Sequence, residues 1–211
     1  MKSFSAIFLT LAGAFGLHAA IQSQLIEYKQ GDTTLAGVLV YDDAVKKPRP
    51  GVLVMHQWLG LTDYERGRAR QLAELKKSAL VDAKRAAAIG YCFGGTAVLE
   101  LARSGAELNG VVSLHGGLDS PAPADGKNIK CAVLACHGAD DPFVKPEDLA
   151  AFEAELRDAK VDWQLIKYGG AVHSFTQLMA ANDNSKGAAY NQRADERSWA
   201  DMKQFFGQIL K

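Results

Sequence analysis

The sequence has no excess of charge of either sign and very little cysteine. Among 211 residues, 24 lysines and arginines stand against 24 aspartates and glutamates, so the formal net charge is zero. Long-range attraction to phosphate needs a basic excess, and we therefore expect no nucleic-acid partner. Three cysteines are too few for a disulfide framework. Hydrophobic residues at 48% and charged residues at 23% predict an ordinary globular domain, which excludes disordered and fibrous chains.

Residues 1–20 differ from the rest of the chain. A positively charged start is followed by an almost wholly apolar run over 4–17, which ends in small residues. This order is typical of a secretory signal peptide cleaved after Ala19 or Ala20. A membrane anchor is the alternative, but the run is shorter than the roughly 20 residues that cross a bilayer. We expect a secreted or periplasmic protein whose mature chain, 21–211, is a single domain without a membrane span.

Extended and helical patterns alternate along the mature chain. Residues 25–29 and 34–41 predict a hairpin, and short apolar runs predict strands buried on both faces. These further strands are expected at 51–56, 86–91, 110–114, 131–136 and 161–168, and helices at 62–75, 95–103, 146–160 and 196–210. The alternation predicts an α/β fold, with a mostly parallel sheet, helices on both faces and an antiparallel N-terminal edge.

The segment Gly90-Tyr91-Cys92-Phe93-Gly94 has the pattern of a nucleophile elbow, with cysteine where most such enzymes carry serine. It lies between an expected strand and an expected helix, which is the context that this motif needs. The sharp turn requires residues without side chains two positions before and after the nucleophile. A helix N-terminus would favour the thiolate form of Cys92. The alternative is a small buried cysteine beside an incidental glycine turn.

A nucleophile of this kind needs an acid and then a histidine base later in the chain. Asp140 and Asp141 follow an expected strand, and His173 lies in a glycine-rich loop after the last one. His173 is the only histidine after the acids, so chain order selects it as the base. We favour Asp141 as the acid because Pro142 restricts its backbone, whereas Asp140 has the character of a turn or capping residue.

The remaining histidines and cysteines predict structural roles. His56, His115 and His137 each end an expected strand, and without acidic neighbours at ligand spacing they predict no metal site. Cys131 and Cys136 lie on one expected strand, about 16 Å apart and on opposite faces. A disulfide needs Cα atoms within about 7 Å, so we expect two buried free thiols.

The sequence resembles the dienelactone hydrolase family of α/β-hydrolases over most of its length. The resemblance is carried by HQWLGLTDY (56–64), GYCFGG (90–95), HGADDPFV (137–144) and YGGAVHSF (168–175). It implies hydrolysis of a small ester or lactone through a thioester on Cys92, with His173 as base and Asp141 as its orienting acid. It also implies an oxyanion hole from the backbone N–H groups of Trp58 and Phe93, and no metal or organic cofactor.

Two positions depart from the family pattern. The family usually has a glutamate where this chain has Gln57, and that glutamate contacts the resting thiol and takes part in its activation. The neutral amide of Gln57 cannot accept the proton of a thiol. An arginine usually follows the histidine by four residues, whereas this chain has Gln177, which argues against a carboxylated lactone. Aromatic residues near the expected site favour an apolar or aromatic ester instead, although any of them could belong to the core. They are Trp58, Tyr91, Phe93, Phe143 and Phe175.

Two alternatives stay open. Between 75 and 86 the chain lacks the strand and helix that the family has there, a unit of roughly 30 residues or more. Either the protein is shortened at this point or a segment is missing from the sequence, and we favour the second because both flanks look like intact family sequence. The alternative to an enzyme is a binding protein in which Gln57 leaves the thiol inert. Thiol redox catalysis is disfavoured, because the sequence has no C-x-x-C pair.

Overall fold

The computed structural model describes residues 21–30, 32–44, 50–58 and 84–211. Its first elements are β1 (Ile21–Gln30) and β2 (Thr33–Asp42), an antiparallel pair in which Ile21 faces Asp42 and Gln30 faces Thr33. The expected hairpin is therefore confirmed, and both strands are longer than predicted. Alternation of exposed and half-buried residues along β2 is typical of a strand with one sheltered face.

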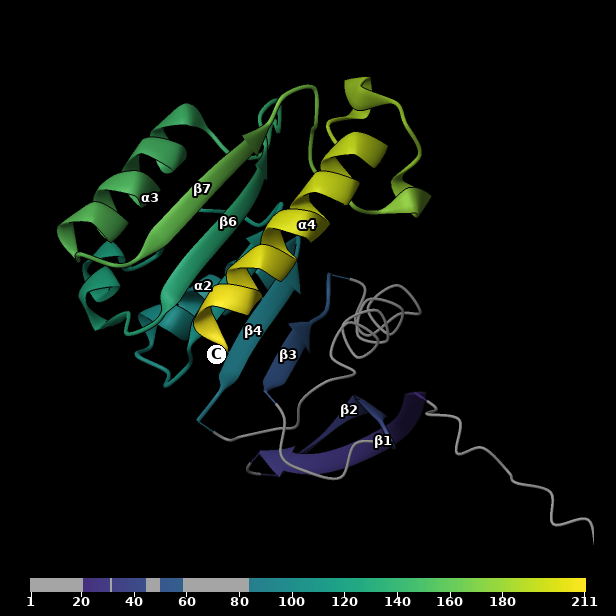
Figure 1. The fold of residues 1–211 in the computed structure, drawn as a ribbon. Helices are drawn as coiled ribbons and strands as arrows, with labels where there is room; N and C mark the ends of the chain where they lie inside the picture. Colours follow the sequence, from purple (N-terminus) through teal and green to yellow (C-terminus); the bar gives the residue numbers. More distant parts are fainter. Residues whose placement is uncertain (1–20, 31, 45–49, 59–83) are drawn as a thin grey trace, which may run out of the picture.

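A parallel sheet forms the centre of the molecule (Figure 1). Its five strands are neighbours in chain order, and every adjacent pair is parallel. They are β3 (Gly51–Met55), β4 (Ala86–Tyr91), β5 (Gly110–Leu114), β6 (Ala132–Gly138) and β7 (Trp163–Tyr168). The central strands β5 and β6 are buried along their whole length, as strands covered on both faces must be. The expected α/β architecture is confirmed.

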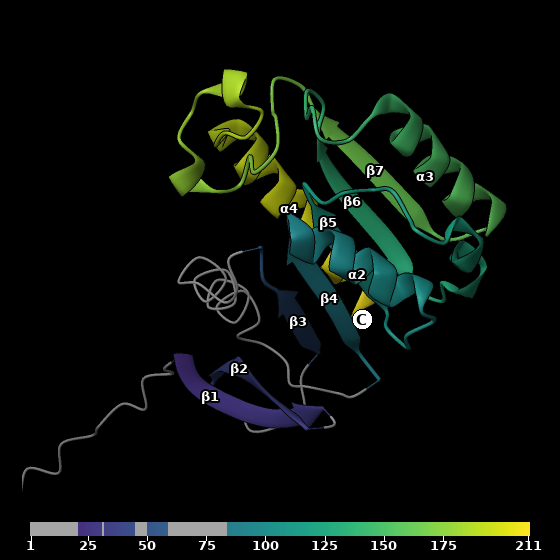
Figure 2. The same cartoon turned by 180° about the vertical axis from the view of Figure 1, so that it is seen from behind.

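Helices cover both faces of this sheet (Figure 1, Figure 2). The helix α4 (Gln192–Ile209) packs on one face through Met202, Phe205 and Phe206. The helices α2 (Phe93–Arg103) and α3 (Pro146–Asp158) pack on the other. Three short 3₁₀ turns complete the described part: η1 (Pro123–Asn128), η2 (Leu178–Ala180) and η3 (Asn184–Lys186). The helix expected at 62–75 and most of the shortened segment between 75 and 86 lie outside the described residues.

The start of α4 differs from the prediction by one turn. The apolar pattern indicates a start at residue 196, whereas the helix begins at Gln192. The side chain of Asn191 explains the difference, because its Oδ1 accepts a hydrogen bond from the backbone N–H of Ala194 at 3.1 Å. Such a cap stabilises a first turn that is polar and therefore gives no hydrophobic signal.

The two cysteines of the β6 segment lie on opposite faces of the sheet, as expected. Cys136 belongs to the core beneath α4, and Cys131 to the core beneath α2 and α3. Both are buried and free. Burial in apolar surroundings raises the pKa of Cys131 and raises the pKa of Cys136 to about 12. Each therefore stays a neutral thiol and serves as a small core residue.

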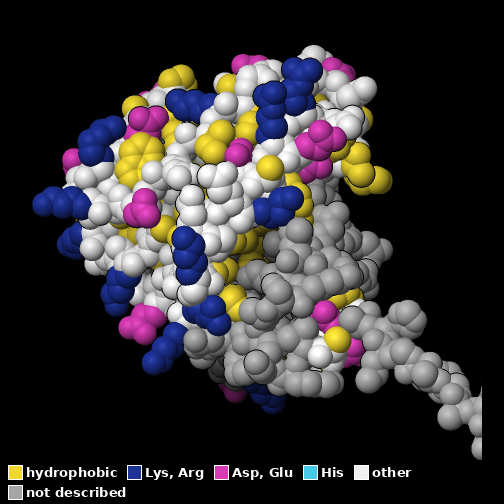
Figure 3. Space-filling view, viewed as in Figure 1, with side chains coloured by type: hydrophobic (Ala, Val, Ile, Leu, Met, Phe, Trp, Pro, Cys, Tyr) yellow, Lys and Arg dark blue, Asp and Glu magenta, His cyan; other side chains and the backbone are white. Residues whose placement is uncertain are grey.

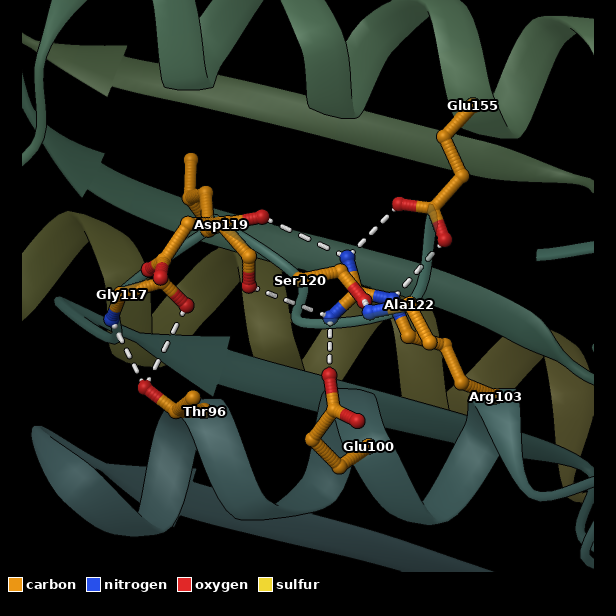
Figure 4. A network of polar contacts seen from close by, with 9 residues as sticks. Thr96, Glu100, Arg103, Gly117, Asp119, Ser120, Ala122 and Glu155 are labelled. Atoms are coloured by element: carbon orange, nitrogen blue, oxygen red, sulfur yellow. Dashed lines mark hydrogen bonds and ion pairs between the residues drawn. The ribbon is translucent and has the colours of Figure 1, made fainter. Parts of the chain in front are cut away.

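A buried ionic cluster joins the helices α2 and α3 (Figure 4). Arg103, the last residue of α2, donates from Nε and Nη2 to the two carboxylate oxygens of Glu155 on α3, at 2.8 and 2.7 Å. It also donates to Glu100 at 2.6 Å and to the carbonyl of Leu118 at 3.3 Å. The side chains of Arg103 and Glu155 are only 3% and 4% exposed. The cluster therefore fixes both helices and the loop after β5 as one layer.

Charges of both signs are interspersed over the surface that Figure 3 shows, in keeping with a net charge of zero. Within the described ranges, no helix combines the length and apolar character that crossing a bilayer requires.

Candidate active site

Cys92 alone forms the turn between β4 and α2. Its backbone has φ 54° and ψ −121°, a region that residues with a side chain rarely adopt. A Cβ atom on Gly90 would lie 1.9 Å from the carbonyl oxygen of Gly94, and one on Gly94 would lie 2.6 Å from the carbonyl oxygen of His56. Any side chain at these two positions would collide with neighbouring backbone, so both must be glycine. This close approach of backbone segments is the geometry of a nucleophile elbow.

The side chains of Cys92, His173 and Asp141 form a continuous chain of contacts. His173 Nε2 lies 3.1 Å from Cys92 Sγ, and His173 Nδ1 lies 2.9 Å from Asp141 Oδ2. The other carboxylate oxygen, Oδ1, accepts the backbone N–H of Phe143 at 2.9 Å. The Asp141 side chain is fully buried, whereas that of His173 is 15% exposed. The acid is therefore fixed at both oxygens and the base faces the surface beside the thiol.

Asp140 has a different partner. Its Oδ2 accepts the backbone N–H of Gly170 at 3.0 Å, in the loop that carries His173. The Gly170 carbonyl in turn accepts from the Nδ2 atoms of Asn184 and Asn191, each at 3.0 Å. Of the two adjacent aspartates, Asp141 therefore contacts the imidazole of His173, and Asp140 contacts the backbone of the loop that carries this histidine.

The contact between Cys92 and His173 shifts their pKa values in opposite directions, downward for the thiol and upward for the imidazole. Burial opposes the charged thiolate, but the hydrogen bond and charge of His173, with the backbone N–H of Phe93, outweigh it and lower the pKa of Cys92. Burial also opposes the charged imidazolium, yet hydrogen bonds to Asp141 and Cys92 and their charges raise the pKa of His173 to about 9. Both shifts favour a thiolate beside an imidazolium over the neutral pair.

Three of the five aromatic residues selected from the sequence flank this pair. Trp58, Phe93 and Phe143 are 77%, 48% and 63% exposed. The Trp58 and Phe93 rings meet edge to face with centroids 5.5 Å apart, and the Phe143 ring lies edge-on to the imidazole of His173 at 5.4 Å. An apolar surface therefore borders both the nucleophile and the base.

The other two aromatic residues lie in the core instead. Tyr91 and Phe175 are fully buried on the α4 side of the sheet. Tyr91 is the last residue of β4, and Phe175 packs against Tyr168 with ring centroids 5.4 Å apart. Without exposed surface they contribute packing and not a pocket wall.

The remaining selected residues lie around the same edge of the sheet. Gln57 follows β3 and is buried, and Gln177 is half-buried where η2 begins. His56 directs Nδ1 to the carbonyl of Gln57 at 2.6 Å. His137 is buried at the end of β6, and burial lowers its pKa. Among the described residues, no group of three or more His, Cys, Asp or Glu side chains could hold a metal ion.

The sequence does not predict the contacts that His115 makes at the site. Strand position predicts a hydrogen-bonded structural histidine, and the ring is indeed buried and hydrogen-bonded. One of its partners, however, is the backbone N–H of Cys92, which lies 3.1 Å from Nδ1 and also donates to the carbonyl of Leu114 at 3.0 Å. A positive φ of 41° turns the ring toward the elbow, and nothing in the residue pattern signals that backbone conformation.

Comparison with known proteins points to one family. The model of the dienelactone hydrolase family matches residues 64–210. The uncharacterized protein K02A2.1 of Caenorhabditis elegans is 32% identical over 139 residues, which are 64% of this chain and 86% of the worm protein. The human carboxymethylenebutenolidase homolog is 28% identical over 94 residues, which are 44% of this chain and 38% of the human protein.

Two solved structures are similar over nearly the whole chain. The structure named m3DLH is 35% identical with a TM-score of 0.85, over 91% of this chain and 100% of that one. The dienelactone hydrolase-like promiscuous phosphotriesterase P91, from metagenomic libraries, is 34% identical with a TM-score of 0.85 over the same shares.

Proposed function

Because the chain belongs to the dienelactone hydrolase family, we propose that it hydrolyses a small uncharged ester or lactone through a thioester on Cys92. Family membership identifies the chain as a carboxylic ester hydrolase with a small-molecule substrate. What we propose in addition is the catalytic mechanism. One observation supports it most directly. His173 Nε2 is 3.1 Å from Cys92 Sγ while His173 Nδ1 is 2.9 Å from the buried Asp141.

The first half of the reaction forms the thioester. The Cys92 thiolate attacks the carbonyl carbon and the carbonyl oxygen takes the negative charge. The C–O bond to the leaving group then breaks, and the leaving alkoxide takes the proton from His173 Nε2. Asp141 stabilises the imidazolium before the transfer and keeps its Nδ1 proton in place.

The second half releases the acid. A water molecule loses its proton to His173 Nε2 and attacks the thioester carbonyl carbon. The C–S bond breaks, the carboxylic acid leaves, and Cys92 returns as the thiolate beside the imidazolium. Water supplies both the hydroxyl of the acid and the proton that reloads the base, so the cycle needs no metal ion or organic cofactor.

The oxyanion would be held by the backbone N–H groups of Phe93 and Trp58. Phe93 is the first residue of α2, where backbone N–H groups lack intrahelical partners. The backbone N–H of Phe93 contributes to the lowered pKa of Cys92, which is consistent with its position beside the reacting sulfur. Edge-to-face contact of the two rings, at 5.5 Å, brings the Trp58 segment to the same place.

An apolar or aromatic ester suits the borders of the site. Trp58, Phe93 and Phe143 present exposed rings there, and Gln177 stands where the family pattern has an arginine for a substrate carboxylate. We therefore expect phenyl and short-chain aryl esters to be better substrates than esters with a free carboxylate.

Phosphotriesters are a second candidate substrate class. The observation in favour is the likeness to the phosphotriesterase P91, 34% identical over 91% of this chain. A thiolate can attack phosphorus as it attacks a carbonyl carbon. Hydrolysis of a chromogenic neutral phosphotriester by this protein, and its loss in Cys92→Ala, would establish the second activity.

The decisive experiment is an intact-mass measurement before and after brief exposure to a chromogenic short-chain acyl ester. We expect an acyl adduct on Cys92 that decays as the chromophore is released. Cys92→Ala is the matched control and should give neither adduct nor turnover. Full esterase activity in that variant would refute the thioester. No adduct and no chromophore across a panel of esters would favour the binding-protein alternative.

We further propose that the protein is exported. The support is the order of a charged start, an apolar run and small residues within 1–20. The strand β1, Ile21–Gln30, lies wholly after the expected cleavage site. Cleavage after Ala19 or Ala20 would therefore leave the strand whole.

A further inference from the structure

A single buried imidazole joins the nucleophile's turn to the base's loop. His115 follows β5 and is fully buried. Its Nδ1 lies 3.1 Å from the backbone nitrogen of Cys92, and its Nε2 lies 2.8 Å from Oγ1 of Thr176. Thr176 is buried three residues after His173, in the same loop. The ring therefore spans from the elbow to the segment that carries the base.

The two contacts define one protonation form of the ring. The Cys92 N–H is shared between the carbonyl of Leu114, at 3.0 Å, and His115 Nδ1. A backbone N–H can only donate, so Nδ1 faces it as an acceptor and carries no proton. The proton of a neutral imidazole then sits on Nε2, from which it is donated to Thr176. A charged His115 would direct an N–H group at the N–H group of Cys92. The raised proton affinity of His173, whose ring centroid is 5.3 Å away, also disfavours a second positive charge there.

The backbone of both partners is strained. His115 has φ 41° and Cys92 has φ 54°, in a region that costs free energy for a residue with a Cβ atom. β4 and β5 are adjacent parallel strands, and the two residues follow their last paired residues, Tyr91 and Leu114. Strain of this kind persists where the surroundings demand it, and it clusters at functional sites. Here it turns an imidazole inward beneath the nucleophile.

We infer that His115 is a positioning residue, which as the neutral Nε2–H tautomer sets the separation between Cys92 and His173. It does not touch the reacting atoms. It acts on the elbow through the Cys92 N–H and on the base through Thr176, because a fixed ring between them prevents the thiol and the imidazole from drifting apart. The kinetic consequence rests on the proposed function, whereas the tautomer and the reactivity of the thiol do not.

The variants Thr176→Val and Thr176→Ser form the first matched pair. Valine keeps the shape and removes the acceptor, whereas serine keeps the hydroxyl. We expect Thr176→Val to lower kcat about ten- to a hundredfold with KM within about twofold, because small misplacements of reacting groups cost this much. Thr176→Ser should recover most of the loss. Equal activity of the two variants would overturn the proposal.

His115→Asn and His115→Leu form the second pair. Asparagine tolerates a positive φ and can accept from the Cys92 N–H in place of Nδ1. We expect the asparagine variant to keep a rate of Cys92 alkylation by iodoacetamide within about threefold of the parent. The leucine variant should be slower by about tenfold or more, because the fraction of Cys92 present as thiolate depends on its surroundings. Alkylation that is as fast with leucine as with histidine would contradict a positioning role.

Nitrogen-15 NMR of the unmodified protein tests the tautomer without any variant. We expect an unprotonated Nδ1 and a protonated Nε2 for His115 at neutral pH, and a charged ring or a proton on Nδ1 would overturn the assignment. Alkylation and NMR need no ester substrate. If Cys92→Ala kept its esterase activity, the proposed function would fail while these two readouts still decided the role of His115.

Discussion

At the scale of single residues, two adjacent aspartates provide a matched pair for testing the base. Asp141 Oδ2 contacts His173 Nδ1, and Asp140 Oδ2 accepts from the Gly170 backbone. Asp141→Asn keeps the shape but cannot stabilise an imidazolium, so kcat should fall roughly 10³- to 10⁴-fold. Asp140→Asn still accepts from Gly170 and should stay within about threefold. Steady-state kinetics on one chromogenic ester, with circular dichroism of both variants, measures this. Equal losses would contradict the assignment.

The pH dependence follows from the same contacts. In the proposed mechanism, the active form holds a thiolate and a protonated imidazole. Protonation of Cys92 removes the nucleophile at low pH, although its lowered pKa delays that loss. Deprotonation of His173 removes the proton donor as the pH passes its raised pKa of about 9. We expect kcat/KM to give a bell shape with its alkaline limb near that pKa. Activity that keeps rising beyond it would show that the imidazolium is not needed.

Gln57→Glu tests whether the missing glutamate silences the thiol. Gln57 is buried next to His56, whose carbonyl lies against the start of α2. A carboxylate there would add negative charge near the elbow and raise the pKa of Cys92, as the charge of Asp141 already does in part. We expect alkylation at neutral pH to slow about three- to tenfold. A large gain in alkylation or turnover would instead show that Gln57 had left the site inert.

Residue type and chain order single out Cys92 and His173, and Pro142 favours Asp141 over Asp140. The structure brings the side chains of these three residues into contact. Residue type and chain order are not enough to assign His115, since its role depends on a positive φ that packing imposes. They also cannot separate Tyr91 from Phe93. These aromatic residues stand on either side of one strained turn, and one enters the core while the other faces solvent.

At the scale of elements, the ionic cluster between α2 and α3 predicts a large stability effect. Glu155→Ala would leave Arg103 charged and buried without its bidentate partner, and we expect a loss of about 3–5 kcal/mol in the free energy of unfolding. Arg157→Ala is the control, because its pair with Glu153 spans 3.8 Å with the Arg157 side chain 63% exposed. That change should cost less than about 1 kcal/mol. Urea unfolding measures both, and similar values would contradict the distinction.

The sequence predicts the strands better than it predicts the loops around the site. The parallel strands are short apolar runs because both faces are buried, and that pattern is visible in the sequence. The segment from η2 through η3 has no such pattern. It is held by hydrogen bonds of backbone and amide groups, including that from Asn184 to the carbonyl of Gly170. Such contacts depend on where the sheet and α4 have already placed the chain.

At the scale of the whole molecule, export predicts a defined mature end. We expect a protein recovered from the periplasm or the medium to begin at Ala20 or Ile21, because the apolar run is removed with the signal peptide. Intact mass and N-terminal sequencing of the recovered protein test this. Replacing two residues of the apolar run with lysine should retain the full-length chain inside the cell. A recovered protein that still carried Met1 would refute cleavage. In a protein with the expected mature end, a mass above that of residues 20–211 or 21–211 would reveal the segment suspected between 75 and 86.

The labelling rates of the two buried thiols can measure how often each helical layer separates from the sheet. Cys131 lies beneath α2 and α3 and Cys136 beneath α4, both free and both with raised pKa. In a Cys92→Ala background, a disulfide reagent reaches either sulfur only when its own layer comes away from the sheet. Under native conditions, the labelling rate of each cysteine therefore reports how often its own layer opens. Faster labelling at Cys136 would show that α4 detaches first, and matched rates would show that the layers open as one cooperative unit.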